Sequence, residues 1–88
     1  MAPAGYSLIF EDGFSSLDGW KVTSPEQFRG YGQEIWDASH VAIVNGQLAL
    51  GATPDMHSGE VRSISKFGFG YYECRMKLPK TPGFWPAF

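Results

Sequence analysis

Apolar and polar residues alternate along much of this chain, and turn signals interrupt the alternation at short intervals. Residues 70–78 alternate most regularly, with an apolar set at even positions and a largely charged set at odd positions, so the two sets point to opposite faces of a strand. Shorter extended segments are predicted at residues 6–10, 20–23 and 60–65, and no segment has a helical period. Short strands separated by regular turns predict an all-β sandwich or barrel.

A β-hairpin at residues 41–50 is the best-defined local element. Two apolar strands, residues 41–44 and 47–50, flank Asn45-Gly46. Both of these residue types tolerate the positive φ angles of a type I′ turn, whose twist matches that of the paired strands. Residues 24–32, with one proline and two glycines, are predicted to be irregular.

Length and composition limit the classes of protein that fit. Eighty-eight residues allow one domain, and 43% hydrophobic residues exceed what a disordered chain carries. The net charge is −2 and the cations are scattered, which argues against binding to nucleic acid or to a membrane surface. No apolar run approaches the ~18 residues of a membrane span, and the first residues lack the pattern of a signal peptide. Cys74 is the only cysteine, so no intramolecular disulfide can form, and we expect a buried, inert thiol.

Several runs together resemble the N-terminal half of a family 16 glycoside hydrolase, the group that includes laminarinases, lichenases and agarases. They are L-I-F-E-D-G-F at 8–14, the 41–50 hairpin, S-G-E-V-R-S at 58–63, F-G-F-G-Y-Y-E-C-R-M-K-L-P-K at 67–80 and G-F-W-P-A-F at 83–88. The resemblance implies an antiparallel β-sandwich of the concanavalin-like jelly-roll type. It also implies that residues 1–88 are the N-terminal part of a single domain, ending before the catalytic strand.

The chain lacks the acids that the resemblance leads one to expect. In the family, W-P-A-F leads into a strand with E-x-D-x-x-E, which carries the nucleophile, a helper aspartate and the general acid/base; that motif does not occur in these 88 residues. A retaining glycosidase needs two carboxyl groups ~5–5.5 Å apart. The nine acids present show no such pattern, and Glu60 and Glu73 with Arg62 and Arg75 are interpreted as a solvated charge ladder. We therefore assign no catalytic residue and expect the chain to be inactive alone.

Sugar binding is a separate matter, because sugar rings pack on aromatic side chains and their hydroxyls need polar partners. By resemblance, Trp85 lies beside the substrate cleft and Arg62 points toward substrate. Gln33 and Trp36 match a cleft-lining segment more loosely. The alternatives are that Trp85 fills the core, that Arg62 pairs with a nearby glutamate, and that Gln33 and Trp36 pack a loop.

Metal ligands are not expected among the histidines: His40 and His57 lie in polar turn contexts and are predicted to be exposed and unliganded. No cofactor is predicted. The resemblance leaves open a structural calcium ion bound through Glu11 and the Gly46 carbonyl, although the family's F-x-D-E-F pattern reads F-E-D-G-F here.

Three function classes follow. The first is a fragment of a secreted, endo-acting retaining hydrolase of β-glucan (β-1,3 or β-1,3-1,4) or a related polysaccharide, with the secretion implied by the resemblance. The second is a non-catalytic glycan-binding module. The third is an inactive half-sandwich that self-associates. In each class we expect self-association or a complementing chain to cover the open sheet.

Overall fold

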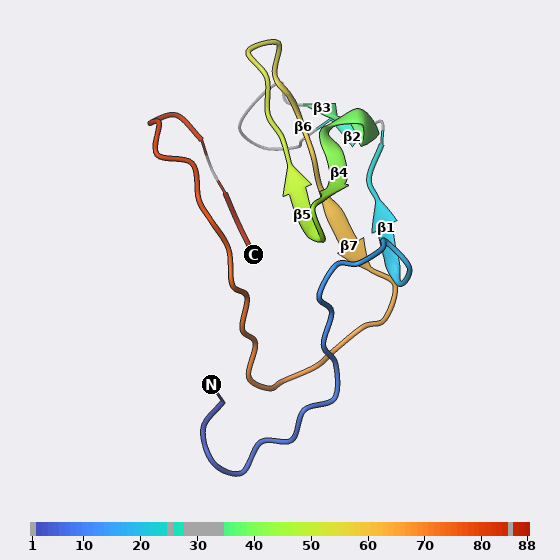
Figure 1. Cartoon of the computed structure of the whole chain (residues 1–88), viewed down its shortest axis with the longest axis vertical. Coiled ribbons are helices and arrows are strands. Elements are labelled where there is room, and N and C mark those ends of the chain that lie inside the picture. The colour runs from blue at the N-terminus through green and yellow to red at the C-terminus, as the bar shows by residue number, and fades with distance from the viewer. Residues whose placement is uncertain (1, 25, 28–34, 85) are drawn as a thin grey trace. The chain divides into compact units, whose positions relative to one another are not determined.

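The chain folds as small β-sheets joined by extended segments. The structure, a computed structural model, describes residues 2–24, 26–27, 35–84 and 86–88 (Figure 1). It divides into two units, Met1–Ile9 with Gly68–Phe88 and Phe10–Phe67, and every strand of the described residues lies in the second unit. Those elements are β1 Trp20–Val22, β2 Glu26–Gln27, β3 Ile35–Trp36, the 3-10 helix η1 Ala38–His40, β4 Val41–Val44, β5 Gln47–Leu50, β6 His57–Ser58 and β7 Val61–Ser63.

Antiparallel pairing dominates the sheets. β1 pairs with β7, β2 with β3 and β4 with β5, all antiparallel, while β3 and β6 pair in parallel. The predicted strands at residues 20–23 and 60–65 are therefore confirmed in their central parts, as β1 and β7. The predicted all-β class is also confirmed.

The β4–β5 hairpin has the predicted geometry. Val41 faces Leu50 and Val44 faces Gln47, so two residues connect the strands. Those residues, Asn45 and Gly46, have φ angles of 52° and 71°. Two consecutive positive φ angles are the signature of the type I′ turn, so the prediction from Asn-Gly is confirmed.

Aromatic side chains gather where the chain enters and leaves the β1–β7 sheet. The ring of Trp20 lies 5.2 Å from that of Phe14 and 6.0 Å from that of Phe10, which in turn lies 4.9 Å from Phe67. Asp12 joins this group, because one carboxylate oxygen accepts from Trp20 Nε1 and the other from the Phe14 amide, each at 2.6 Å. These contacts anchor the segment before β1.

Two predicted strands are not strands in the structure. Residues 6–10 and 70–78 form no ladder with other described residues, and Leu8 and Ile9 are 78% and 83% exposed. The physical reason is that alternation prepares a segment for a sheet, but a strand also needs a neighbour for its backbone groups. The prediction of a buried Cys74 is wrong for the same reason, since its side chain is exposed.

Burial is shallow throughout the described residues. Only Thr23, which is 3% exposed, is buried, and no described hydrophobic side chain is. The one helix among these residues has three residues, so the described part of the chain holds no helix that could cross a membrane.

Candidate functional site

Arg62, a predicted substrate-binding residue, lies in the middle of β7. It faces Lys21 of β1 in the antiparallel ladder, and its side chain is 54% exposed. Its Nε donates to Oε1 of Glu60 at 2.6 Å, which confirms the ion pair considered from the sequence. Glu60 directly precedes β7, two positions before Arg62, and residues two apart in an extended chain point to the same side.

Glu60 connects this face to Thr23, the one buried residue in the part of the chain that the structure describes. The Thr23 hydroxyl donates to the same Glu60 Oε1 at 2.8 Å, and the Thr23 amide donates to the Glu60 carbonyl at 3.1 Å. These bonds continue the β1–β7 pairing by one residue. A shared acceptor thus holds the Arg62 guanidinium at the surface of β7, where its planar set of N–H donors suits hydroxyl oxygens.

The remaining predicted substrate-binding residues are placed only in part. Trp36 lies in β3, half-buried, and pairs with Glu26 of β2 and Ser58 of β6. Gln33 and Trp85 lie outside the described residues. The cleft assignments of all four therefore stay predictions, as does the calcium site at Glu11 and the Gly46 carbonyl.

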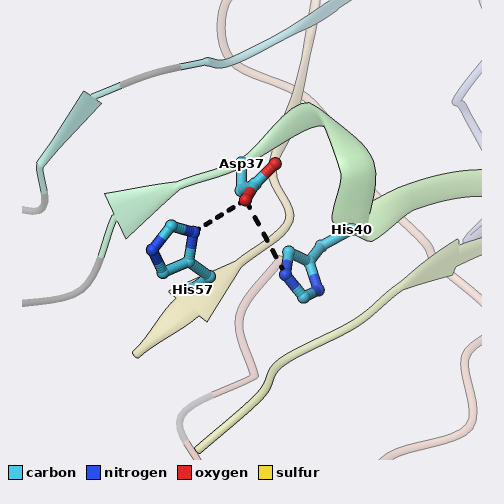
Figure 2. Close-up of side chains that lie close together, drawn as sticks. All are labelled: Asp37, His40 and His57. Carbon is cyan, nitrogen blue, oxygen red and sulfur yellow. Dashed lines mark hydrogen bonds and ion pairs between the residues drawn. The ribbon is translucent and has the colours of Figure 1, made fainter. Parts of the chain in front are cut away.

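A group of titratable side chains, Asp37, His40 and His57, meets at the end of the β3–β6 pair (Figure 2). Asp37 directly follows β3 and caps η1, His40 ends η1, and His57 opens β6. Asp37 Oδ2 lies 2.7 Å from His57 Nδ1 and 3.9 Å from His40 Nε2. The side chains are 29% (Asp37), 17% (His40) and 31% (His57) exposed, so the prediction of exposed histidines is wrong, whereas the prediction that they are unliganded stays a prediction.

The Asp37 carboxylate is oriented by the turn that it begins. Its Oδ1 accepts from the Ser39 amide at 2.9 Å and from the Ser39 hydroxyl at 2.7 Å, which leaves Oδ2 directed at the histidines. The hydrogen bonds from Ser39 and from His57 hold the pKa of the Asp37 carboxyl well below its usual range. Asp37 is therefore negatively charged at neutral pH.

Glycine allows the two backbone segments of this group to approach. Gly59 follows β6, and a Cβ atom built on it would lie 2.5 Å from the His40 carbonyl oxygen, which is too close for any other residue. The amide of Gly51 donates to the same oxygen at 2.8 Å, and the Gly59 amide donates to the Gly51 carbonyl at 3.0 Å. His57, two residues before Gly59, is thereby brought beside His40.

Sequence reasoning missed this group because its members lie far apart in the chain. The sequence contains a local signal for Asp37 only, because Asp-x-Ser at 37–39 is the pattern of a side-chain cap at the start of a helix. Nothing in the sequence states that β3 and β6 pair in parallel, which is what brings Asp37 to His57.

Comparison with known proteins agrees with this all-β architecture. Residues 29–88, well over half of the chain, match the family model described as Glycosyl hydrolases family 16. The chain belongs to this family. Family 16 membership confirms the resemblance found in the sequence, and the fold fits a part of the family's jelly roll.

Relatives of this family 16 chain are named beta-glucanases. It is 42% identical over 60 residues to one from Acetivibrio thermocellus, covering 61% of this chain and 18% of that protein. It is 30% identical over 82 residues to one from Bacillus amyloliquefaciens, covering 88% of this chain and 29% of that protein. The chain thus spans less than a third of the length of each of these relatives. No solved structure gives a significant match.

Proposed function

We propose that this chain supplies part of the substrate cleft of an endo-acting, retaining β-glucan hydrolase that acts on β-1,3 or β-1,3-1,4 linkages and is secreted. The observation that carries the proposal is the match of residues 29–88 to family 16, together with beta-glucanase relatives at 42% and 30% identity. The chain contributes binding groups, while the E-x-D-x-x-E acids are not among its 88 residues. Hydrolysis of a glycosidic bond therefore requires carboxyl groups from outside these residues.

Arg62 is the described residue best suited to contact a sugar. Its guanidinium is half-exposed, and the Glu60 carboxylate fixes its Nε. A positioned guanidinium loses less side-chain entropy when it donates to a hydroxyl oxygen than a free one does. Trp36, Gln33 and Trp85 are assigned to the same cleft, with Trp85 as the aromatic platform for a sugar ring.

The first test asks whether these 88 residues are sufficient for hydrolysis. Reducing ends are assayed after incubation of laminarin, lichenan and agarose with the 88-residue chain and with the complete natural protein. We expect activity from the complete protein on one of the glucans and none from the chain alone. Hydrolysis by the chain alone would contradict the requirement for further acids.

Variants of the complete protein test the cleft residues. Arg62→Ala and Trp85→Ala should each raise the concentration of glucan needed for half-maximal rate, by roughly 10-fold for about 1.4 kcal/mol of lost binding. Lys66→Ala removes a cation from an exposed position near β7 and is the matched control. Equal effects at Arg62 and Lys66 would show that only net charge matters and would remove Arg62 from the cleft.

A glycan-binding module without activity is the second candidate, because the catalytic motif does not occur in the sequence. In that case the complete protein should be retained on insoluble β-glucan and release no reducing ends.

A third candidate, a self-associating half-sandwich, is supported by the exposure of large hydrophobic side chains such as Leu8, Ile9 and Phe69. Gel filtration of the 88-residue chain as a stable monomer would exclude it.

A further inference from the structure

We propose that Asp37 Oδ2, His40 Nε2 and His57 Nδ1 together bind one divalent transition-metal ion of the zinc class, with its remaining coordination positions open to water. These residues form the one group of three or more His, Cys, Asp and Glu side chains, among the described residues, whose ligand atoms gather closely enough for a shared ion. The site is built from Asp37 between β3 and η1, from His40 of η1 and from His57 of β6, and its occupation requires no glycosidase activity.

The distances fit a small ion after modest side-chain adjustment. Zinc binds nitrogen and oxygen ligands at ~2.0–2.2 Å, so neighbouring ligand atoms in a tetrahedral site lie about 3.3–3.5 Å apart. Here Oδ2 of Asp37 lies 2.7 Å from His57 Nδ1 and 3.9 Å from His40 Nε2. All three ligand atoms lie within 4.8 Å of one another. Binding therefore requires the first pair to separate by about 0.7 Å and the second pair to close by about 0.5 Å.

The chemistry of the ligands selects the class of ion. Two imidazoles and one carboxylate suit zinc and its transition-metal neighbours. Calcium and magnesium require mostly oxygen ligands, and calcium takes six to eight of them. This site is therefore distinct in chemistry from a calcium site built on carboxylates and carbonyls.

Neighbouring groups hold the ligands in place before any ion arrives. Ser39 binds Asp37 Oδ1 through both its amide and its hydroxyl, so Oδ2 alone is presented to the histidines. Such outer contacts orient metal ligands and raise their affinity. The close approach of Gly59 to the His40 carbonyl fixes the distance between the backbones that carry the two histidines.

The ion would link segments that are distant in the sequence. Asp37 and His57 lie 20 residues apart, and the whole β4–β5 hairpin lies between them. An ion bound only by the folded form closes this loop and stabilises the fold by mass action. In its absence, the hydrogen bond between His57 Nδ1 and Asp37 Oδ2 makes the same link more weakly, and the ion would take the place of the shared proton.

Zinc titration of the complete natural protein by calorimetry tests the proposal. We expect one equivalent of Zn²⁺ to be lost, or its affinity to fall more than about 100-fold, in each of Asp37→Asn, His40→Gln and His57→Gln, because even outer-contact losses cost ~10–100-fold. Asp18→Asn makes the same chemical change at an exposed position and should bind like the natural protein. Unchanged zinc binding in the three ligand variants would overturn the proposal.

A second measurement needs no variant and so does not depend on variants folding. Diethyl pyrocarbonate modifies free imidazole nitrogens, and peptide mass spectrometry can follow His40 and His57 separately. Saturating Zn²⁺ should slow the modification of both residues together; equal rates with and without Zn²⁺ would overturn the proposal.

Ser39→Ala should weaken zinc binding by about 10-fold through the loss of its hydroxyl contact to Asp37, whereas unchanged affinity would contradict that positioning role.

Discussion

Gly59→Ala is the substitution to which the structure assigns the clearest cost. A Cβ atom at Gly59 would lie 2.5 Å from the His40 carbonyl oxygen and 3.0 Å from Val41 Cγ2. To reach the 3.4 Å of ordinary contact with that oxygen, the two backbones must separate by about 0.9 Å. The φ angle of Gly59 is not in the left-handed region, so the cost comes from this approach and not from backbone strain.

The magnitude follows from what the separation breaks. A movement of that size would stretch the bonds from Gly51 to the His40 carbonyl and from Gly59 to the Gly51 carbonyl, now 2.8 Å and 3.0 Å long. Each such bond contributes ~0.5–1.5 kcal/mol, and overpacking costs ~1–3 kcal/mol. We therefore expect Gly59→Ala to lower the free energy of unfolding by about 1–3 kcal/mol.

Gly51→Ala is the matched control, because it makes the same change beside the same residue. Its Cβ would meet His40 Nδ1 at 3.5 Å and the His40 carbonyl oxygen at 3.7 Å, both ordinary contacts. At a compatible backbone position, alanine stabilises by ~0.4–1 kcal/mol. Urea denaturation of the complete natural protein and of both variants provides the comparison. Equal stability of the two variants would refute the reasoning from close approach.

Three further predictions concern other parts of the chain. Gly46→Ala should lower the free energy of unfolding by about 1–2 kcal/mol in the same denaturation assay, because Gly46 has a φ of 71°; Gly13→Ala, at an open position with ordinary φ, should change it little. Thr23→Val should cost ~1 kcal/mol by removing the hydroxyl that bonds the Glu60 carboxylate, and a stability equal to that of the natural protein would show that this bond adds nothing. The hydrogen bond to Glu73 raises the pKa of Tyr71, so its contribution to stability is fully present below pH ~10 and is lost as the pH rises through the folded-state value. Glu73→Gln should lower the Tyr71 pKa in an NMR titration of its ring, and an unchanged pKa would contradict the assigned cause.

Local features of the fold could be predicted from the sequence where a few adjacent residues decide the conformation. Asn45-Gly46 determines a two-residue turn by its own φ preferences, and the apolar residues on either side determine which strands it joins. The ion pair of Arg62 with Glu60 could also be predicted, because both residues lie in the predicted extended segment at residues 60–65 and residues two apart in such a segment share a face. In each case the information lies within a few residues of the feature.

Alternation failed as a predictor where the outcome depends on a partner. Residues 70–78 have the most regular alternation in the chain, yet Tyr72, Met76 and Leu78 are 54%, 45% and 50% exposed and no ladder forms with other described residues. The two-residue period of the alternation predicts which side chains share a face. It does not state which strand would pair with the backbone or which surface would cover that face.

The Asp37, His40 and His57 group depends on three features that no local pattern contains. The first is the parallel pairing of β3 with β6, which aligns Ile35 with His57. The second is the η1 turn, in which the Asp37 carboxylate caps its own helix and directs Oδ2 at both rings. The third is the close contact of Gly59 with the His40 carbonyl. Neither histidine has a sequence context that predicts metal binding. Only their common position beside one oriented carboxylate makes the group a candidate metal site. Family 16 membership is encoded in contiguous runs, so it could be recognised in the sequence, whereas this site required a structure.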